Sequence, residues 1–148
     1  NNVKNYIADD SRILICRGSN IFGNSIGGRN FVGIALNSLL TTNVIELNSN
    51  KKVVKDFLPI DIHSKILECL ITNDAVGTFN VGSGVNINLG ELCDQFIKGF
   101  KSGKIEDSDT INDQFMLDIS KIRQYINLDI SSEKILSYAY NIGKNLGK

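Results

Sequence analysis

The chain has 148 residues, of which 42% are hydrophobic and 22% charged, and its 16 basic and 16 acidic residues cancel. That length supports one compact domain, residues 1–148, and the neutral balance gives no broad field to attract nucleic acid or an anionic membrane surface. No run approaches the roughly 20 apolar residues that cross a bilayer, so we expect neither a nucleic-acid nor a membrane partner.

The three cysteines, Cys16, Cys69 and Cys93, are odd in number and form no CxxC pair. Each lies among apolar neighbours, where a free cysteine behaves as a small hydrophobic residue. Buried, reduced thiols are typical of a cytoplasmic protein, and we predict that location. With His63 as the single histidine of the chain, we predict no metal site.

The first thirty residues predict the end of a helix, a strand and a loop. Val3, Tyr6 and Ile7 have the spacing of one helix face. Residues 12–17 form a continuous apolar run of strand length, which is typical of a parallel strand covered on both faces. Residues 18–30 are rich in Gly, Ser and Asn and predict a loop.

The next segment predicts a helix followed by two extended pieces. Apolar spacing indicates a helix over 31–41, and 44–47 reads as a strand that ends in a turn at 48–50. Residues 53–58 form another extended piece. Pro59, the only proline, indicates a strand end or an edge strand.

Two helices flank a strand in the middle of the chain. Apolar residues recur at helical spacing over 62–71, with Asp61 placed to cap the amino end. A strand at 79–81 follows. Asn88 has the sequence signature of an N-cap for the next helix, and Gly103 is expected to end it.

The last third of the chain predicts a polar surface loop at 104–113 and a short extended segment at 115–117. Asp118 can cap a brief helix, and a final helix is expected to begin near Ser131. The alternation of helices and strands predicts an α/β domain.

Four segments, in order, resemble the carboxyl-terminal half of the extended short-chain dehydrogenase/reductases, the NAD-dependent epimerase/dehydratase family. Residues 17–23 resemble R-x-x-N-V-Y-G, 55–61 resemble R-D-F-I-H-V-D, 77–84 read GTFNVGSG, and 117–121 resemble A-D-x-S-K. The resemblance implies strands of a doubly wound, Rossmann-like parallel sheet with a small α+β substrate-binding lobe. It also implies a nucleotide-diphosphate sugar as substrate, NAD or NADP as cofactor, and a homodimer for the full-length protein.

The resemblance further implies particular site residues. The implied substrate contacts are Asn20, Asn30, Phe31 and Lys55, and the implied cofactor contacts are Gly18 and Ser19. The family reads the nucleobase along the strand at 44–47 through backbone groups. Asp56 is implied to hold neighbouring backbone rather than to act in catalysis.

Structural alternatives stay open at these positions. Asn20 can serve only its own turn, Lys55 can be a solvated side chain, and Phe31 can be plain core. Lys55 replaces the family's arginine, so it keeps the charge and loses the bidentate fork. The stretch 104–116 lacks the arginine that many members use as a second diphosphate ligand. His63 is interpreted as a packing or surface residue, and the glycines of 82–84 as a sharp turn rather than an anion cradle.

The family's catalytic YxxxK motif and its GxxGxxG cofactor loop do not occur in this sequence. We therefore expect the chain to be the substrate-binding half of such an enzyme, inactive alone, with no catalytic residue and with an apolar docking surface that favours self-association. One alternative is a non-catalytic binding or interaction module of the same fold. A second, a self-contained domain that only resembles the family, is disfavoured because the strands at 12–17 and 79–81 are expected to lack partners within the chain.

Overall fold

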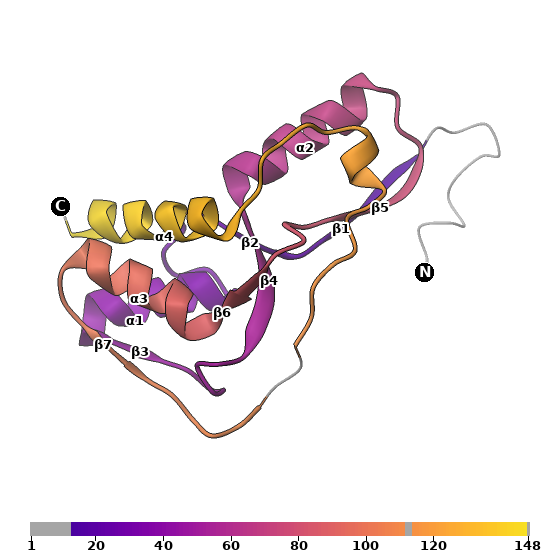
Figure 1. Cartoon of the computed structure of the whole chain (residues 1–148). Coiled ribbons are helices and arrows are strands. Elements are labelled where there is room, and N and C mark those ends of the chain that lie inside the picture. Colours follow the sequence, from indigo (N-terminus) through magenta and orange to yellow (C-terminus); the bar gives the residue numbers. More distant parts are fainter. Residues whose placement is uncertain (1–12, 112–113, 148) are drawn as a thin grey trace.

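The computed structural model describes residues 13–111 and 114–147 (Figure 1), so the helix end predicted at residues 3–7 lies outside it. The elements in chain order are β1 (Leu14–Gly18), β2 (Asn20–Phe22), α1 (Phe31–Thr42), β3 (Val44–Glu46), β4 (Val54–Pro59), α2 (Ile60–Thr72), β5 (Gly77–Val81), β6 (Asn86–Asn88), α3 (Leu89–Phe100), β7 (Lys104–Glu106), a 3-10 turn (Ile122–Gln124) and α4 (Ser132–Leu146).

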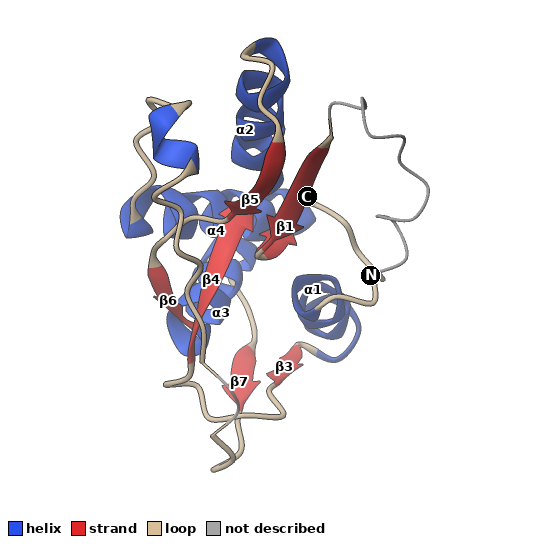
Figure 2. Ribbon diagram, turned by 90° about the vertical axis from the view of Figure 1, so that its right-hand side faces the viewer, coloured by secondary structure: helices blue, strands red, loops and turns tan. Residues whose placement is uncertain are grey.

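The strands pair into three small sheets. β1 and β5 form a parallel pair, and Figure 2 shows them side by side. β4 lies between β2, which is parallel to it, and β6, which is antiparallel. β3 and β7 form a second parallel pair. The mixture of helices with mainly parallel strands confirms the predicted α/β class.

The pairing of β1 with β5 corrects two expectations. The strands predicted at 12–17 and 79–81 do have a partner within the chain, namely each other. Among residues 13–111 and 114–147, β1 is also covered on one face only. Leu14 and Cys16 pack against the core, whereas Ile13 and Ile15 stay half-buried and outside both core clusters, because the described residues cover only one side of the strand.

The hydrophobic core consists of two clusters that meet at β4. Phe57 belongs to the cluster formed with α1, α3 and α4, and the next residue, Leu58, belongs to the cluster beneath α2 and β5. Consecutive strand residues point to opposite faces, so β4 separates the two cores and contributes to each. Figure 1 shows this division, with α1, α3 and α4 gathered on one side of β4 and α2, β1 and β5 on the other.

Helices α3 and α4 approach each other at two glycines. A Cβ atom added to Gly99 would collide with the carbonyl oxygen of Tyr140, and one added to Gly143 would collide with the carbonyl oxygen of Phe96. Both residues are buried within their helices. The close packing of the two backbones therefore depends on the missing side chains.

Three helices begin at the polar residues that the sequence indicates. Asn30, Asn88 and Ser131 are the N-caps of α1, α3 and α4, and each side chain accepts a hydrogen bond from backbone in the first turn. The prediction for Asp61 is wrong. Pro59 is the N-cap of α2, without a side-chain bond, because β4 runs directly into the helix and leaves Asp61 inside the first turn.

The other differences concern short strands and helix ends. β2, β6 and β7 have three residues each. β2 and β7 lie in stretches expected to be loop, whereas β6 lies between the turn at 82–84 and the helix start at Asn88, where no element was predicted. α3 ends at Phe100, and Lys101 rather than Gly103 takes the left-handed C-cap conformation, with a φ of 68°. The helix predicted after Asp118 is only a 3-10 turn, although Asp118 Oδ1 accepts the predicted kind of local hydrogen bond from Ser120 N at 2.9 Å.

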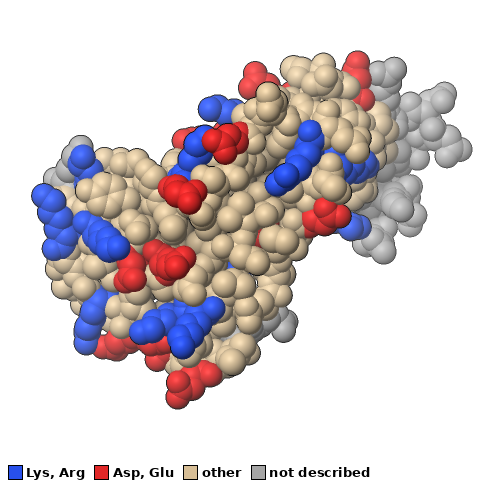
Figure 3. Space-filling model, in the orientation of Figure 1, with Lys and Arg blue, Asp and Glu red and all other residues tan. Residues whose placement is uncertain are grey.

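The cysteines are free thiols, as predicted, but only Cys93 is fully buried; Cys16 and Cys69 are half-buried. Burial raises the pKa of the Cys93 thiol to about 12, with a smaller contribution from the charge of Asp94. Basic and acidic side chains are interspersed over the face shown in Figure 3. Within residues 13–111 and 114–147, no helix is both long and apolar enough to cross a membrane.

Candidate functional site

A cavity of about 190 Å³ lies among α1, β2, β3 and β4. Three of the residues predicted to contact substrate, namely Asn20, Phe31 and Lys55, line it together. They come from β2, the first turn of α1, and β4, which are separated in sequence and brought together by the parallel pairing of β2 with β4 and by the packing of α1 on the same core.

Asn20 is fixed by a hydrogen bond to the neighbouring strand. Its Nδ2 donates to the backbone carbonyl oxygen of Asp56 at 2.9 Å, and the residue is half-buried. The structural role of this side chain is thus to join β2 to β4 rather than to serve its own turn. Since an amide group has two N–H donors and one acceptor oxygen, the bond leaves Asn20 one N–H and its oxygen for a ligand.

Lys55 supplies the positive charge of the cavity wall. It is half-buried on β4, where its backbone lies opposite Ile87 of β6 and is bridged to Phe115. No hydrogen bond or salt bridge from a described residue engages its ammonium group. A lysine in this state keeps its three N–H donors for an anionic ligand.

Phe31 and Asn30 have different positions although they are neighbours. The Phe31 ring is half-buried and lies 6.0 Å from the Phe57 ring, tilted by 47°, so part of its surface faces the cavity. Asn30 is not among the residues that line the cavity. Its Oδ1 accepts a hydrogen bond from Gly33 N at 2.7 Å and caps α1, so its observed role is to fix the position of Phe31.

Gly18 and Ser19 lie outside the cavity, at the end of β1. Ser19 N donates to the carbonyl oxygen of Val81 at 3.0 Å and continues the pairing of β1 with β5. The hydroxyl oxygen of Ser19 is buried and has no hydrogen-bond partner among residues 13–111 and 114–147. The implied cofactor contact of these two residues stays a prediction.

The glycine-rich turn at 82–84 encloses a side chain of the protein itself, the Asp56 carboxylate. Asp56, which is fully buried, accepts bonds from Ser83 N and Ser83 Oγ at 2.8 Å and from Gly84 N at 2.9 Å. A fourth bond, at 3.3 Å, comes from Leu117 N. This confirms that Asp56 holds backbone, and it shows that the turn is filled by a carboxylate rather than left open for a ligand.

The sequence did not single out several cavity residues. Glu46 at the end of β3, Asn48 and Ser49 in the following turn, and Ile34 on α1 also line the cavity. The position of Glu46 could have been predicted from strand alternation. Ile45 and Leu47 are apolar and buried, so the Glu46 side chain between them lies on the opposite face of the strand. The contribution of Ser49, which is buried, depends on how the turn folds.

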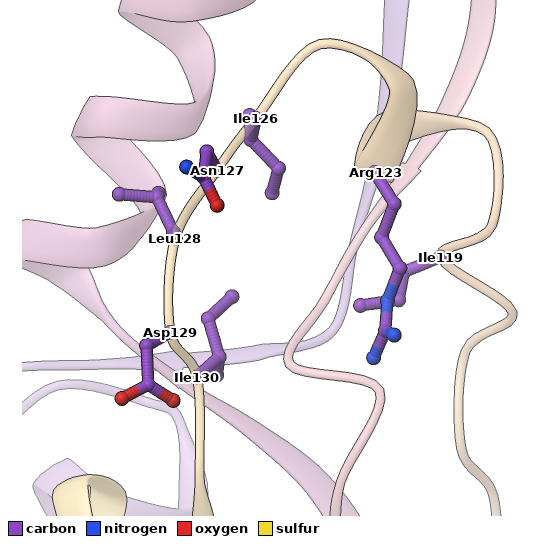
Figure 4. Close-up of a pocket in the computed structure, with 7 residues that line it drawn as sticks. All are labelled: Ile119, Arg123, Ile126, Asn127, Leu128, Asp129 and Ile130. Carbon is purple, nitrogen blue, oxygen red and sulfur yellow. The ribbon is translucent and has the colours of Figure 1, made fainter.

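A larger cavity lies elsewhere and contains none of the predicted site residues. It measures about 350 Å³ and is formed around the 3-10 turn and the segment 126–130, where Arg123 and Asp129 are the charged side chains shown in Figure 4. Lys134 Nζ already pairs with Asp129 Oδ2 at 2.7 Å. His63 lines neither cavity; it is half-buried on α2, where burial lowers its pKa, in agreement with a packing role.

The comparisons with known proteins give a likeness in structure, whereas comparison of the whole sequence gives no match. No family model matches the chain, and no curated protein sequence does. The solved structure of UDP-N-acetylglucosamine 4-epimerase from Methanobrevibacter ruminantium M1 in complex with UDP-N-acetylmuramic acid superposes with a TM-score of 0.72 and 18% identity, over 90% of this chain and 45% of that one.

Two further structures give the same picture. UDP-glucuronic acid 4-epimerase from Bacillus cereus, in complex with UDP-glucuronic acid and NAD, matches with a TM-score of 0.70 and 18% identity over 91% of this chain and 46% of that one. dTDP-glucose 4,6-dehydratase from Bacillus anthracis, in complex with NAD, matches with a TM-score of 0.70 and 15% identity over 89% and 44%. The chain therefore has the fold of part of these α/β enzymes and spans less than half the length of each.

Proposed function

We propose that this chain is the substrate-binding part of an NAD- or NADP-dependent epimerase, dehydratase or reductase that acts on a nucleotide-diphosphate sugar. The observation that carries the proposal is the cavity in which Asn20, Phe31 and Lys55 meet. These residues belong to different segments of the chain, and the resemblance of the sequence assigns all three to substrate contact. The structural likeness to sugar epimerases and dehydratases supports the same function.

The chemistry of the cavity suits one end of a nucleotide-diphosphate sugar. Lys55 can donate charge-assisted hydrogen bonds to phosphate oxygens, and the N–H group that Asn20 keeps can add a neutral one. The partly exposed face of Phe31 offers apolar contact to a ring. A cavity of about 190 Å³ holds a portion of such a ligand, so the rest of the substrate is proposed to extend out of it.

The glycine-rich turn at 82–84 does not offer a site for the phosphates of a nicotinamide dinucleotide. This turn follows a strand, but the Asp56 carboxylate fills it. Because the buried carboxylate accepts four hydrogen bonds there, a phosphate of the cofactor cannot take its place. We propose that Gly18 and Ser19 contact the cofactor at the end of β1 while another part of the full-length protein holds most of it. A homodimer and a cytoplasmic location likewise remain proposals for that protein.

The alternative is a binding or interaction module without catalysis. It is favoured by two observations: a lysine stands where the family has an arginine, and 104–116 contains no arginine. Both changes weaken bidentate recognition of a diphosphate. The two hypotheses differ in one respect: under the proposed function, a YxxxK motif in another part of the full-length protein supports turnover of a nucleotide sugar, and under the alternative there is no turnover.

Calorimetric titration of the 148-residue chain with UDP, dTDP and GDP tests the proposed binding function. We expect at least one nucleoside diphosphate to bind, and Lys55→Gln to weaken that binding at least about tenfold. Lys98→Gln, on the exposed face of α3 and outside the cavity, is the matched control. Equal affinity of the Lys55→Gln and wild-type proteins, or no binding at all, would overturn the proposal.

A further inference from the structure

We propose that the Glu46 carboxylate reads the nucleobase and selects guanine, so that the nucleotide sugar is a GDP-sugar. The proposal rests on the proposed function and adds the substrate class to it. It begins from the polar residues of the cavity, which divide between two groups of elements. Asn20 and Lys55 come from β2 and β4, whereas Glu46, Asn48 and Ser49 come from β3 and the turn that follows it.

Glu46 brings a negative charge to a cavity that is expected to bind a diphosphate. It is exposed, and no hydrogen bond or salt bridge from residues 13–111 or 114–147 occupies its carboxylate. Its neighbour across the parallel strand pair, Glu106, is instead paired with Lys104 at 2.5 Å. A carboxylate repels phosphate and accepts hydrogen bonds only, so the part of the ligand beside Glu46 must be a hydrogen-bond donor.

The apolar residues of the cavity suit a planar ring. Ile34 lies one turn after Phe31 on α1 and lines the same cavity. Its side chain is 55% exposed, whereas its neighbour Ala35 on the same cavity wall is only 3% exposed. A base placed between the side chains of Phe31 and Ile34 and β3 would cover both of them. The volume of about 190 Å³ accommodates a single base with part of its ribose.

Among the bases, guanine fits an acceptor-only carboxylate best. Guanine presents two adjacent donors on its Watson–Crick edge, N1–H and N2–H, which can form a bidentate pair with the two carboxylate oxygens. Uracil and thymine present one N–H between two carbonyl oxygens, and those oxygens would face the negative charge. Adenine and cytosine present a single amino group beside an acceptor nitrogen. Side-chain recognition at β3 would replace reading of the base by backbone groups.

The test is calorimetric titration of the 148-residue chain with GDP, IDP, UDP, dTDP, ADP and CDP. IDP retains N1–H and lacks the 2-amino group, so it isolates one of the two proposed bonds. We expect GDP to bind at least about tenfold more tightly than IDP and than each of the other diphosphates. In Glu46→Gln we expect the difference between GDP and IDP to fall to about twofold or less.

Glu106→Gln is the matched control, because Glu106 lies opposite Glu46 on β7 and does not line the cavity. It is expected to retain the preference for GDP. Equal melting temperatures of the two variants would show that both are folded, as expected for exposed strand residues. UDP or dTDP binding more tightly than GDP, or a Glu46→Gln protein with an unchanged GDP-to-IDP ratio, would overturn the guanine proposal and leave the proposed function standing. Failure of all six diphosphates to bind would overturn both.

Discussion

Asp56 and Ser83 form two hydrogen bonds through one carboxylate oxygen, although they are 27 residues apart in sequence. The other oxygen of Asp56 receives the backbone N–H groups of Gly84 and Leu117. One buried side chain on β4 therefore fixes both the turn after β5 and the extended segment at 115–117. The burial of this carboxylate is tolerated because four hydrogen-bond donors replace the water that it loses.

We predict that Asp56→Ala lowers the free energy of unfolding by about 3 kcal/mol, because it leaves buried backbone donors without an acceptor. Ser83→Ala should cost about 1 kcal/mol, since it removes one donor and keeps the carboxylate satisfied. Urea denaturation monitored by circular dichroism gives both values. Asp109→Asn, at an exposed loop position, is the control, and an Asp56→Ala protein within about 0.5 kcal/mol of that control would contradict the prediction.

The contact of α3 with α4 predicts an unusual response to alanine. Replacing a helical glycine with alanine normally stabilises a helix by up to about 1 kcal/mol. At Gly99 and Gly143 the added methyl group would meet the backbone of the other helix, so we expect each substitution to lower the melting temperature by several degrees, through a loss of about 2 kcal/mol or more.

Ser137→Ala provides the comparison, because Ser137 is exposed on α4 and alanine is a better helix former than serine. Its melting temperature should equal or slightly exceed that of the wild type. Thermal denaturation of the three variants decides the matter. A Gly143→Ala protein as stable as Ser137→Ala would show that the helices can separate without cost, contrary to the geometry of the contact.

The elements that could be predicted from the sequence are those with local signals. The cap at Asn88 and the helix start near Ser131 were predicted because a polar side chain before an apolar helical repeat acts on its own first turn. β3 is equally short but lies in the apolar stretch 44–47, which predicted it. β2, β6 and β7 were not predicted, because they lie among polar residues and glycine and are defined by hydrogen bonds to partners far away in sequence. The sequence pattern does not contain that information.

The same distinction applies to the candidate site. Resemblance of short motifs predicted Asn20, Phe31 and Lys55, and the structure brings these three to one cavity. It did not predict that Asp56 fills the glycine-rich turn, because a carboxylate 27 residues away enters only through the tertiary fold. The resemblance also predicted a substrate contact for Asn30; its side chain caps α1, and that contact stays a prediction.

The buried thiol of Cys93 predicts a dependence of stability on alkaline pH. Its pKa is raised to about 12 in the folded protein, from a reference value of 9.0, so at pH values between these limits the unfolded chain binds fewer protons than the folded one. Stability from this group is complete below about pH 9 and is lost as pH rises toward 12, by about 1.4 kcal/mol for each pH unit.

Urea denaturation at pH 7, 9, 10 and 10.5 measures this effect by comparison of the wild type with Cys93→Ala. The variant removes the thiol, so its unfolding free energy should fall less steeply above about pH 9 than that of the wild type. Cys69→Ala, at a half-buried position on α2, controls for loss of a cysteine elsewhere. Parallel pH profiles for wild type and Cys93→Ala would show that burial does not raise the pKa of the Cys93 thiol.

An apolar surface at the end of α2, the loop before β5 and the start of β1 predicts self-association of the chain. Ile71 and Val76 are 66% and 52% exposed, and together with Leu14 they line a shallow cavity of about 180 Å³ beside β1. Burial of such apolar side chains against a second molecule is favourable at about 25 cal/mol for each Å². Under the proposed function, a cofactor-binding part of the full-length protein would cover this face, and the 148-residue chain alone should associate with itself as its concentration rises.

Sedimentation velocity over a range of concentrations measures that association. The double variant Ile71→Lys and Val76→Lys should sediment as a monomer at concentrations where the wild type forms larger species, because two charges would have to be buried at the contact. Ile26→Lys, which changes an isoleucine that is 49% exposed in a different loop, should associate as the wild type does. A wild-type chain that stays monomeric at high concentration, or an Ile26→Lys protein that loses association to the same extent, would mean that the face beside β1 is not the contact surface.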